Sequence, residues 1–214
     1  MQIRLGNHKV HLIHHDPIIY TVDDFLTDEE CQHFIDLALP DLKQSGVTGY
    51  KKDSTKRHDR VMKSHRNSMQ AWVRPELDEI TRSVWGRICN LVQLPKENTE
   101  KFQVMRYTKG QTFRAHMDAF HEKKGESEYL EDGGQRVVTA MVYLNDNVIG
   151  GETEFNKLRY YIKPKKRMLL VWHNCLKDTD KPHPESMHTG RTVKAGEKWA
   201  FSLWIRRNQV KDRR

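Results

Sequence analysis

The chain has 214 residues and a formal net charge of +8, and 36% of its residues are hydrophobic and 31% charged. This balance is typical of one globular domain over residues 1–214, and the lack of an apolar run of about eighteen residues excludes a membrane-spanning helix. Three cysteines without paired spacing argue against a disulfide framework, so we expect a cytoplasmic protein in a reducing compartment.

The first hundred residues predict two helices. Thr27 is followed three positions later by Glu30, a capping-box pattern that predicts a helix start. A second helix is predicted from Pro75 to a point before Pro95, because apolar residues recur there every three or four positions. We expect residues 1–100 to be mainly helical support for the rest of the chain.

The sequence changes character after residue 100. Short β-like runs such as "FQVMRY", "RVVTAMVYL" and "RMLLVW" are separated by turn residues. Many short strands preceded by helices predict an α+β fold, in which a double-stranded β-helix, or jelly-roll barrel, fills residues 101–207 and the helices pack on one of its sheets.

The last predicted strand, residues 198–205, has two different faces. Its odd positions are all bulky and apolar, which suits a core between the sheet and the helices. Its even positions combine a cation, two small residues and an aromatic, which leaves room for a ligand, although a solvated strand edge would also explain the lysine. The even set is Lys198, Ala200, Ser202 and Trp204.

A short motif, "RAHMDAF", sets His116 two positions before Asp118. In an extended segment these side chains point the same way, so both can reach one metal ion, although a surface pair at a strand end has the same spacing. Two histidines and one carboxylate can hold iron and leave positions open for substrates. His188 opens a later predicted strand and is a candidate second histidine. Other candidate ligands are His121, His173 and His183, and a structural zinc site could use His173, Cys175, His183 and His188.

Three segments together resemble the prolyl 4-hydroxylase branch of the iron(II)- and 2-oxoglutarate-dependent dioxygenases. They are "FQVMRYTKGQTFRAHMDAF", "GGQRVVTAMVYLNDNVIGGETEF" and "MHTGRTVKAGEKWAFSLWI", and "YTVDDFLTDEECQHFIDLA" resembles the helical support of that family. The resemblance implies that His116, Asp118 and His188 bind Fe(II) and that Lys198 anchors 2-oxoglutarate. It also implies a cosubstrate hydrogen bond from Tyr107, which could otherwise be an ordinary buried tyrosine.

The resemblance implies hydroxylation of prolyl residues in a peptide or protein, with release of succinate and carbon dioxide. Molecular oxygen would be the cosubstrate and ascorbate a candidate reductant. Arg136 and Trp204 match positions on the substrate side, although Arg136 could instead pair with an acid in the nearby "EYLEDGG" run. The lysine anchor and the "GEKW" context resemble prolyl rather than lysyl hydroxylases.

Some features depart from the family or leave alternatives open. Phe113 stands where tyrosine is frequent, and Asn156 where proline is frequent. The charge of +8 also fits a nucleic-acid oxidative demethylase of the same superfamily, and a non-catalytic jelly-roll binding module is a third hypothesis. Segments 50–70 and 121–135 are expected to cover the active-site mouth, with the basic first segment favouring acidic peptides. The sequence does not decide between monomer and dimer.

Overall fold

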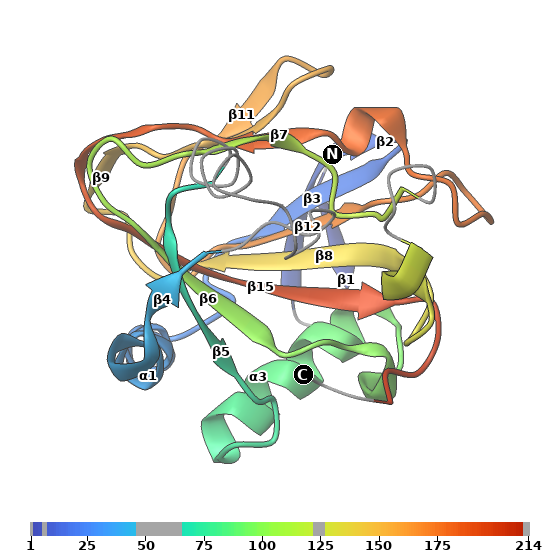
Figure 1. The fold of residues 1–214 in the computed structure, drawn as a ribbon, viewed down its shortest axis with the longest axis horizontal. Coiled ribbons are helices and arrows are strands. Elements are labelled where there is room, and N and C mark those ends of the chain that lie inside the picture. Colours follow the sequence, from blue (N-terminus) through green and yellow to red (C-terminus); the bar gives the residue numbers. More distant parts are fainter. Residues whose placement is uncertain (1, 6–7, 46–65, 122–126, 212–214) are drawn as a thin grey trace, which may run out of the picture.

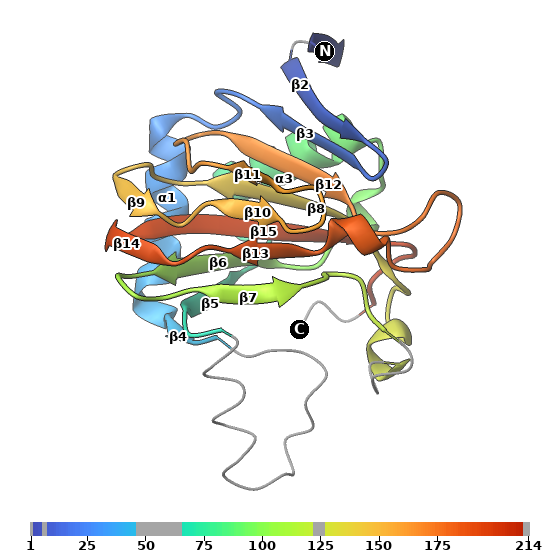
Figure 2. The same cartoon turned by 90° about the horizontal axis from the view of Figure 1, so that it is seen from above.

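Two facing β-sheets and a layer of helices make up the structure, a computed structural model. Helices α1 (Asp28–Ala38) and α3 (Glu79–Val92) cover one side of the larger sheet, and the smaller sheet lies on the other side (Figures 1 and 2). This is the predicted α+β jelly roll, or double-stranded β-helix, with supporting helices packed on one sheet. The structure describes residues 2–5, 8–45, 66–121 and 127–211.

The strands and short helices fall into a simple order. In chain order they are β1 (Gln2–Leu5), β2 (His8–His15), β3 (Ile18–Val22), η1 (Leu39–Asp41), β4 (Lys43–Gln44), β5 (Met69–Val73), η2 (Lys96–Asn98), β6 (Phe102–Tyr107), β7 (Phe113–His116), η4 (Ser127–Leu130), β8 (Arg136–Tyr143), β9 (Val148–Gly150), β10 (Thr153–Phe155), β11 (Tyr160–Ile162), β12 (Leu169–His173), η5 (Pro184–Ser186), β13 (His188–Gly190), β14 (Val193–Gly196) and β15 (Lys198–Arg206). The larger sheet has nine strands in the order β1-β2-β3-β12-β8-β15-β6-β5-β4. The smaller sheet has four in the order β11-β10-β13-β7, and β9 pairs with β14.

The first hundred residues are less helical than expected. They supply α1 and α3, but they also supply strands β1 to β5, which lengthen the larger sheet at both edges. The strands β1, β2 and β3 continue the sheet beyond β12, and β5 and β4 continue it beyond β6. These additions pair backbone groups that the edges of β12 and β6 would otherwise leave exposed.

Helix α1 begins where the capping box predicts. The Thr27 hydroxyl accepts a hydrogen bond from the Glu30 backbone N–H at 3.2 Å, and the Glu30 carboxylate accepts one from the Thr27 N–H at 2.9 Å. The helix buries Cys31, Phe34 and Ala38 against the larger sheet. Its cysteine is a free thiol, as the lack of paired spacing predicts, and it is buried in the core, as is Cys89 of α3.

Helix α3 begins later than the proline suggested. Asp78, not a residue near Pro75, caps the helix: its carboxylate accepts from the Thr81 N–H at 2.8 Å, and the Thr81 hydroxyl accepts from the Asp78 N–H at 3.0 Å. Pro75 lies in a turn before the cap. The helix ends as expected before Pro95, because Gln93 adopts a left-handed conformation with φ of 56°. Neither long helix, nor any other helix in the described ranges, could cross a membrane.

Strand β15 divides the interior as its alternation predicts. On the odd face, the Phe201 ring centroid lies 4.5 Å from that of Phe34 in α1 and 4.9 Å from that of Phe102 in β6. Trp199, Leu203 and Ile205 join the same core between sheet and helices. The even face looks into the space between the two sheets and lines a cavity there.

Candidate metal centre and active-site cavity

Two neighbouring strands of the smaller sheet bring the predicted metal ligands together. In the pairing of β7 with β13, His188 lies directly opposite His116, and Asp118 follows the end of β7. The Asp118 Oδ1 atom lies 3.6 Å from His116 Nε2 and 3.9 Å from His188 Nε2. One ligand atom from each residue lies within 4.8 Å of the others. Residues 72 positions apart in the chain therefore converge on one point.

Backbone carbonyls fix which imidazole nitrogen faces that point. His116 Nδ1 lies 2.8 Å from the Arg114 carbonyl oxygen, and His188 Nδ1 lies 3.0 Å from the Ser186 carbonyl oxygen. A carbonyl can only accept, so each Nδ1 carries the proton and donates it. Each Nε2 is then left with a lone pair directed toward Asp118, which is the form that binds a metal.

The charge states of the cluster also suit a cation. Burial lowers the pKa of the His188 imidazole to about 4, and the neighbouring His116 contributes to this shift. Burial by itself would raise the pKa of the Asp118 carboxyl, but the nearby His188, His116 and Arg136 hold that pKa well below its ordinary value. At neutral pH the cluster thus contains a neutral His188 and an ionised Asp118, the forms in which these residues bind metals.

Two imidazole nitrogens and one carboxylate oxygen on one side of a cavity fit iron, because this set leaves coordination positions open. Within the described ranges, this trio is the group that could hold a metal ion. The zinc alternative is not formed: His183 Nδ1 accepts the Glu185 N–H at 3.1 Å, and its Nε2 lies 3.4 Å from an Asp16 carboxylate oxygen. His121 and His173 lie outside the trio.

A cavity between the two sheets connects the trio with Lys198. Lys198 is only 4% exposed, and its Nζ lies 5.6 Å from the Tyr107 ring centroid and 5.2 Å from that of Tyr143. Burial lowers its pKa to about 8. Tyr107 lines the same cavity, and its hydroxyl contacts Met105 Sδ at 3.7 Å. A buried cation at one end and a metal trio at the other suit a small dicarboxylate between them. The other lining residues are Gln103, Met105, Phe113, Met141, Thr153, Trp172, Gly190, Ala200, Ser202 and Trp204.

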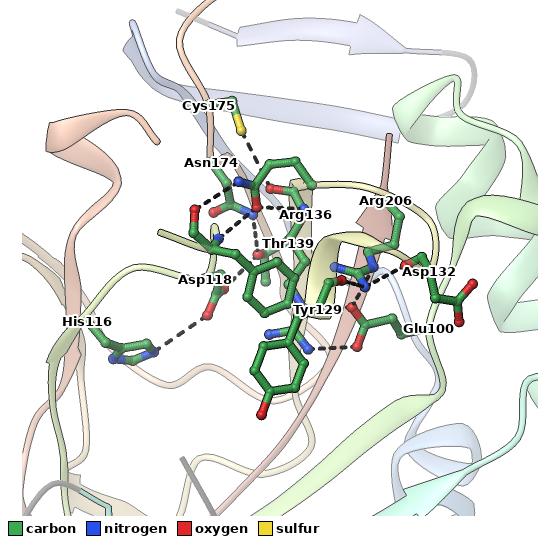
Figure 3. Close-up of polar contacts among 12 residues, drawn as sticks. Glu100, His116, Asp118, Tyr129, Asp132, Arg136, Thr139, Asn174, Cys175 and Arg206 are labelled. Carbon is green, nitrogen blue, oxygen red and sulfur yellow. Dashed lines mark hydrogen bonds and ion pairs between the residues drawn. The ribbon is translucent and has the colours of Figure 1, made fainter. Parts of the chain in front are cut away.

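The two predicted substrate contacts are placed differently. Trp204 lines the cavity, as its parity on β15 predicts. Arg136 lies behind Trp204, with its guanidinium carbon 3.6 Å from the indole ring centroid, and it does not line the cavity. Its Nε and Nη2 donate to the two carboxylate oxygens of Glu100, each at 2.7 Å (Figure 3). The expected alternative, an acid in the "EYLEDGG" run, is therefore the wrong partner.

The "EYLEDGG" run meets a different arginine. Arg206 Nη2 donates to the carbonyl oxygens of Tyr129 and Asp132, both at 2.7 Å, and Arg206 Nε lies 3.3 Å from Glu100 Oε1 (Figure 3). Two buried arginines thus share Glu100, and Arg136 supports one face of Trp204.

Sequence reasoning missed two polar residues beside the trio. The Thr139 hydroxyl donates to Asp118 Oδ2 at 2.7 Å, and the Asn174 side-chain amide donates to Thr139 Oγ1 at 2.8 Å (Figure 3). Strand β8 is buried on both faces, so no alternation marked Thr139 as special. Asn174 follows β12, and a strand-to-loop position offers no sequence signal by itself.

The two departures from the family pattern have local consequences. The Phe113 ring stacks on the His116 imidazole, with centroids 3.5 Å apart and an interplanar angle of 17°. Asn156 uses both groups that a proline would lack: its N–H donates to the Met187 carbonyl at 3.1 Å, and its side-chain oxygen accepts from Thr189 at 3.0 Å. Of the two predicted covering segments, residues 50–65 of the first and residues 122–126 of the second lie outside the described residues, so their covering role stays a prediction.

Comparison with known proteins defines the class. A family model, the 2OG-Fe(II) oxygenase superfamily, matches residues 102–206. A viral collagen prolyl hydroxylase from Paramecium Bursaria Chlorella virus-1, solved as a 2OG complex, has 30% sequence identity and a TM-score of 0.67, covering 88% of this chain and 95% of that one. The chain belongs to the 2OG-Fe(II) oxygenase superfamily, and it is a 2-oxoglutarate-dependent dioxygenase with Fe(II) as its metal and molecular oxygen as cosubstrate.

Curated relatives place it in the prolyl 4-hydroxylase branch. "Prolyl 4-hydroxylase 2" of Arabidopsis thaliana is 32% identical over 218 residues, covering 92% of this chain and 70% of the relative. A "putative prolyl 4-hydroxylase" of Acanthamoeba polyphaga mimivirus is 36% identical over 145 residues, covering 67% of this chain but 60% of the relative. The branch suggested by the sequence motifs is thereby confirmed.

Proposed function

We propose that this chain hydroxylates prolyl residues in a peptide or protein, converting 2-oxoglutarate and oxygen into succinate and carbon dioxide. One observation carries the proposal: the His116, Asp118 and His188 ligand atoms converge at one end of a cavity that also contains the buried Lys198. The relatives named prolyl 4-hydroxylases support the choice of substrate.

In this proposal each residue has a defined task. His116, His188 and Asp118 would hold Fe(II), which supplies the oxygen activation and hydrogen abstraction that side chains cannot perform. Lys198 would pair with the 5-carboxylate of 2-oxoglutarate and replace its lost hydration. Tyr107, whose backbone lies opposite Lys198 in the β6–β15 pairing, would donate a hydrogen bond to the same ligand.

The peptide would approach on the Trp204 side of the cavity. Trp204 is 6% exposed, and its indole N–H has no hydrogen-bond partner among the described residues. Trp72, which is 41% exposed, lies beside it with ring centroids 6.1 Å apart. We propose that Trp204 contacts the peptide and that Arg136 acts by holding the indole in place, since Glu100 already binds its guanidinium.

The nucleic-acid hypothesis has one supporting observation, the net charge of +8. Against it, the site has a lysine anchor, and the relatives described above carry prolyl hydroxylase names. The three free thiols, Cys31, Cys89 and Cys175, support our further proposal of a cytoplasmic setting.

Three matched reactions test the function. The Fe(II)-loaded protein is given 2-oxoglutarate and oxygen with a proline-rich peptide, with a methylated oligonucleotide, or with neither. We expect succinate formation to rise with the peptide, and mass spectrometry to find one added oxygen atom on a prolyl residue. Asp118→Ala should abolish this product, whereas His173→Ala, a histidine outside the trio, should retain it.

Each of three results would count against the prolyl assignment. Demethylation of the oligonucleotide would favour the nucleic-acid hypothesis. Equal succinate formation in all three reactions, with no modified product, would leave the substrate unassigned, and a lack of both metal and 2-oxoglutarate binding would favour a non-catalytic module.

A further inference from the structure

A buried chain of hydrogen bonds runs from Asp118 away from the cavity. Thr139 donates to Asp118 Oδ2 at 2.7 Å, and Asn174 Nδ2 donates to Thr139 Oγ1 at 2.8 Å (Figure 3). We propose that Thr139 and Asn174 are positioning residues for the metal centre, which select the carboxylate oxygen that Asp118 presents to the metal. This inference rests on the proposed assignment of the trio as metal ligands.

Donor and acceptor chemistry fixes the direction of the chain. An amide nitrogen can only donate, so the Asn174 side chain occupies a lone pair of the Thr139 hydroxyl. The Thr139 proton then has one acceptor in this chain, Asp118 Oδ2. That oxygen is held on the side away from the histidines, while Oδ1 remains directed toward His116 Nε2 and His188 Nε2.

The same asparagine is also connected to the second histidine ligand. The Asn174 backbone carbonyl accepts from the His183 N–H at 2.8 Å, and the Ser186 hydroxyl donates to the His183 carbonyl at 2.8 Å, with a longer contact of 3.4 Å to the Asn174 carbonyl. The Ser186 carbonyl in turn accepts the proton of His188 Nδ1 at 3.0 Å. Asn174, which follows β12 of the larger sheet, is therefore connected to two ligands on the smaller sheet: to Asp118 through its side chain and Thr139, and to His188 through its backbone and the His183–Ser186 segment.

A purely structural role explains the arrangement less well. Thr139 and Asn174 are both fully buried, and the Asn174 Oδ1 atom has no hydrogen-bond partner among the described residues. A buried acceptor without a partner is unfavourable for folding. The hydrogen bond that its side-chain amide donates to the Thr139 hydroxyl gives a reason for an asparagine at this position.

Metal affinity measured without turnover tests the proposal. Mn(II), which serves as a redox-inert probe, is titrated into the full chain, and the free ion is counted by electron paramagnetic resonance. Because residues that hydrogen-bond to metal ligands typically contribute tenfold to a hundredfold in affinity, Thr139→Val should weaken Mn(II) binding by about 10- to 100-fold. Thr139→Ser, which keeps the hydroxyl, should restore affinity to within about threefold of wild type.

Further variants separate positioning from general destabilisation. Thr99→Val removes another fully buried hydroxyl, one that accepts from Trp85 and is not among the cavity-lining residues, and it should leave Mn(II) affinity unchanged. Asn174→Leu should weaken Mn(II) binding in the wild-type background but have little added effect on Thr139→Val, because it acts through that hydroxyl. If Thr139→Val fails to fold, Asn174→Leu in the wild-type background still tests the chain, and if Asn174→Leu fails to fold, the comparison of Thr139→Val with Thr139→Ser still does.

The outcomes are distinguishable from failure of the proposed function. Wild-type Mn(II) affinity in Thr139→Val, or equal losses in Thr139→Val and Thr139→Ser, would overturn the positioning role while leaving the metal centre intact. A wild-type protein that binds no Mn(II) would instead reject the metal centre on which the inference rests.

Discussion

The two faces of strand β15, a run of nine residues, have different roles: one packs in the core and the other lines the cavity. The odd face, with Phe201 fully buried against Phe34 and Phe102, belongs to the core between sheet and helices. The even face carries Lys198 and Trp204 into the cavity. Both faces are equally buried, so burial does not separate structure from function here. The side to which each residue points separates them, so substitutions on the odd face should lower folding stability and substitutions on the even face should weaken ligand binding.

The largest expected effect is on the odd face. Phe201→Ala removes a ring packed against Phe34 and Phe102, and it should lower the free energy of unfolding by about 3–5 kcal/mol. Urea denaturation measures this loss. Ser202→Ala on the even face is the matched control, and the division into two faces is contradicted if the control loses as much stability as Phe201→Ala.

The next effect is on the even face. Lys198→Met removes the buried cation while keeping an unbranched side chain, and it should weaken 2-oxoglutarate binding by about 10- to 100-fold, since a hydrogen bond to a charged group contributes about 1.5–3 kcal/mol. Calorimetry on the Mn(II)-loaded protein measures the affinity. Unfolding should stay cooperative. Unchanged affinity would place the carboxylate anchor elsewhere.

The lowered pKa of Lys198 sharpens the same comparison through pH. Above a pH of about 8 the free protein loses the Lys198 proton, so 2-oxoglutarate affinity should fall by about tenfold per pH unit. The free energy of unfolding should change in the opposite direction. Between pH 8 and the ordinary lysine pKa of 10.5 the unfolded chain binds more protons than the folded chain, so the cost of burying this ammonium declines and the free energy of unfolding rises with pH. Both trends should be absent in Lys198→Met, and their persistence there would exclude Lys198 as the cause.

The smallest effect concerns the peptide side. Trp204→Phe keeps a ring on the even face but weakens the contact with the Arg136 guanidinium, a cation–π interaction of about 0.5–2 kcal/mol. The KM for a proline-rich peptide should rise by about two- to tenfold, while the affinity for 2-oxoglutarate stays constant. An effect on 2-oxoglutarate alone would contradict the division of the cavity into two ends.

What could be predicted from the sequence depended on the range of the interaction. Local patterns were sufficient for the Thr27 cap, for the parity of β15 and for the step between His116 and Asp118. The position of His188 required a resemblance between whole segments, because strand pairing joins residues far apart in the chain.

The rest depended on contacts that no local pattern encodes. Glu100, which precedes β6, binds Arg136 of β8, and nothing in either segment indicates that pairing. Thr139 contacts Asp118, and Asn174 contacts Thr139, only because three separate segments of the chain pack together. The Pro75 signal misplaced the start of α3, because Asp78 and Thr81 form a reciprocal cap that a proline in a preceding turn does not reveal.

The central claim is tested most directly by a crystal structure of the protein grown with Mn(II) and 2-oxoglutarate. We predict that the metal is bound by Nε2 of His116, Nε2 of His188 and Oδ1 of Asp118. We also predict that the far carboxylate of 2-oxoglutarate lies within hydrogen-bonding distance of Lys198 Nζ. A metal bound to other side chains, or a 2-oxoglutarate carboxylate distant from Lys198, would contradict the account.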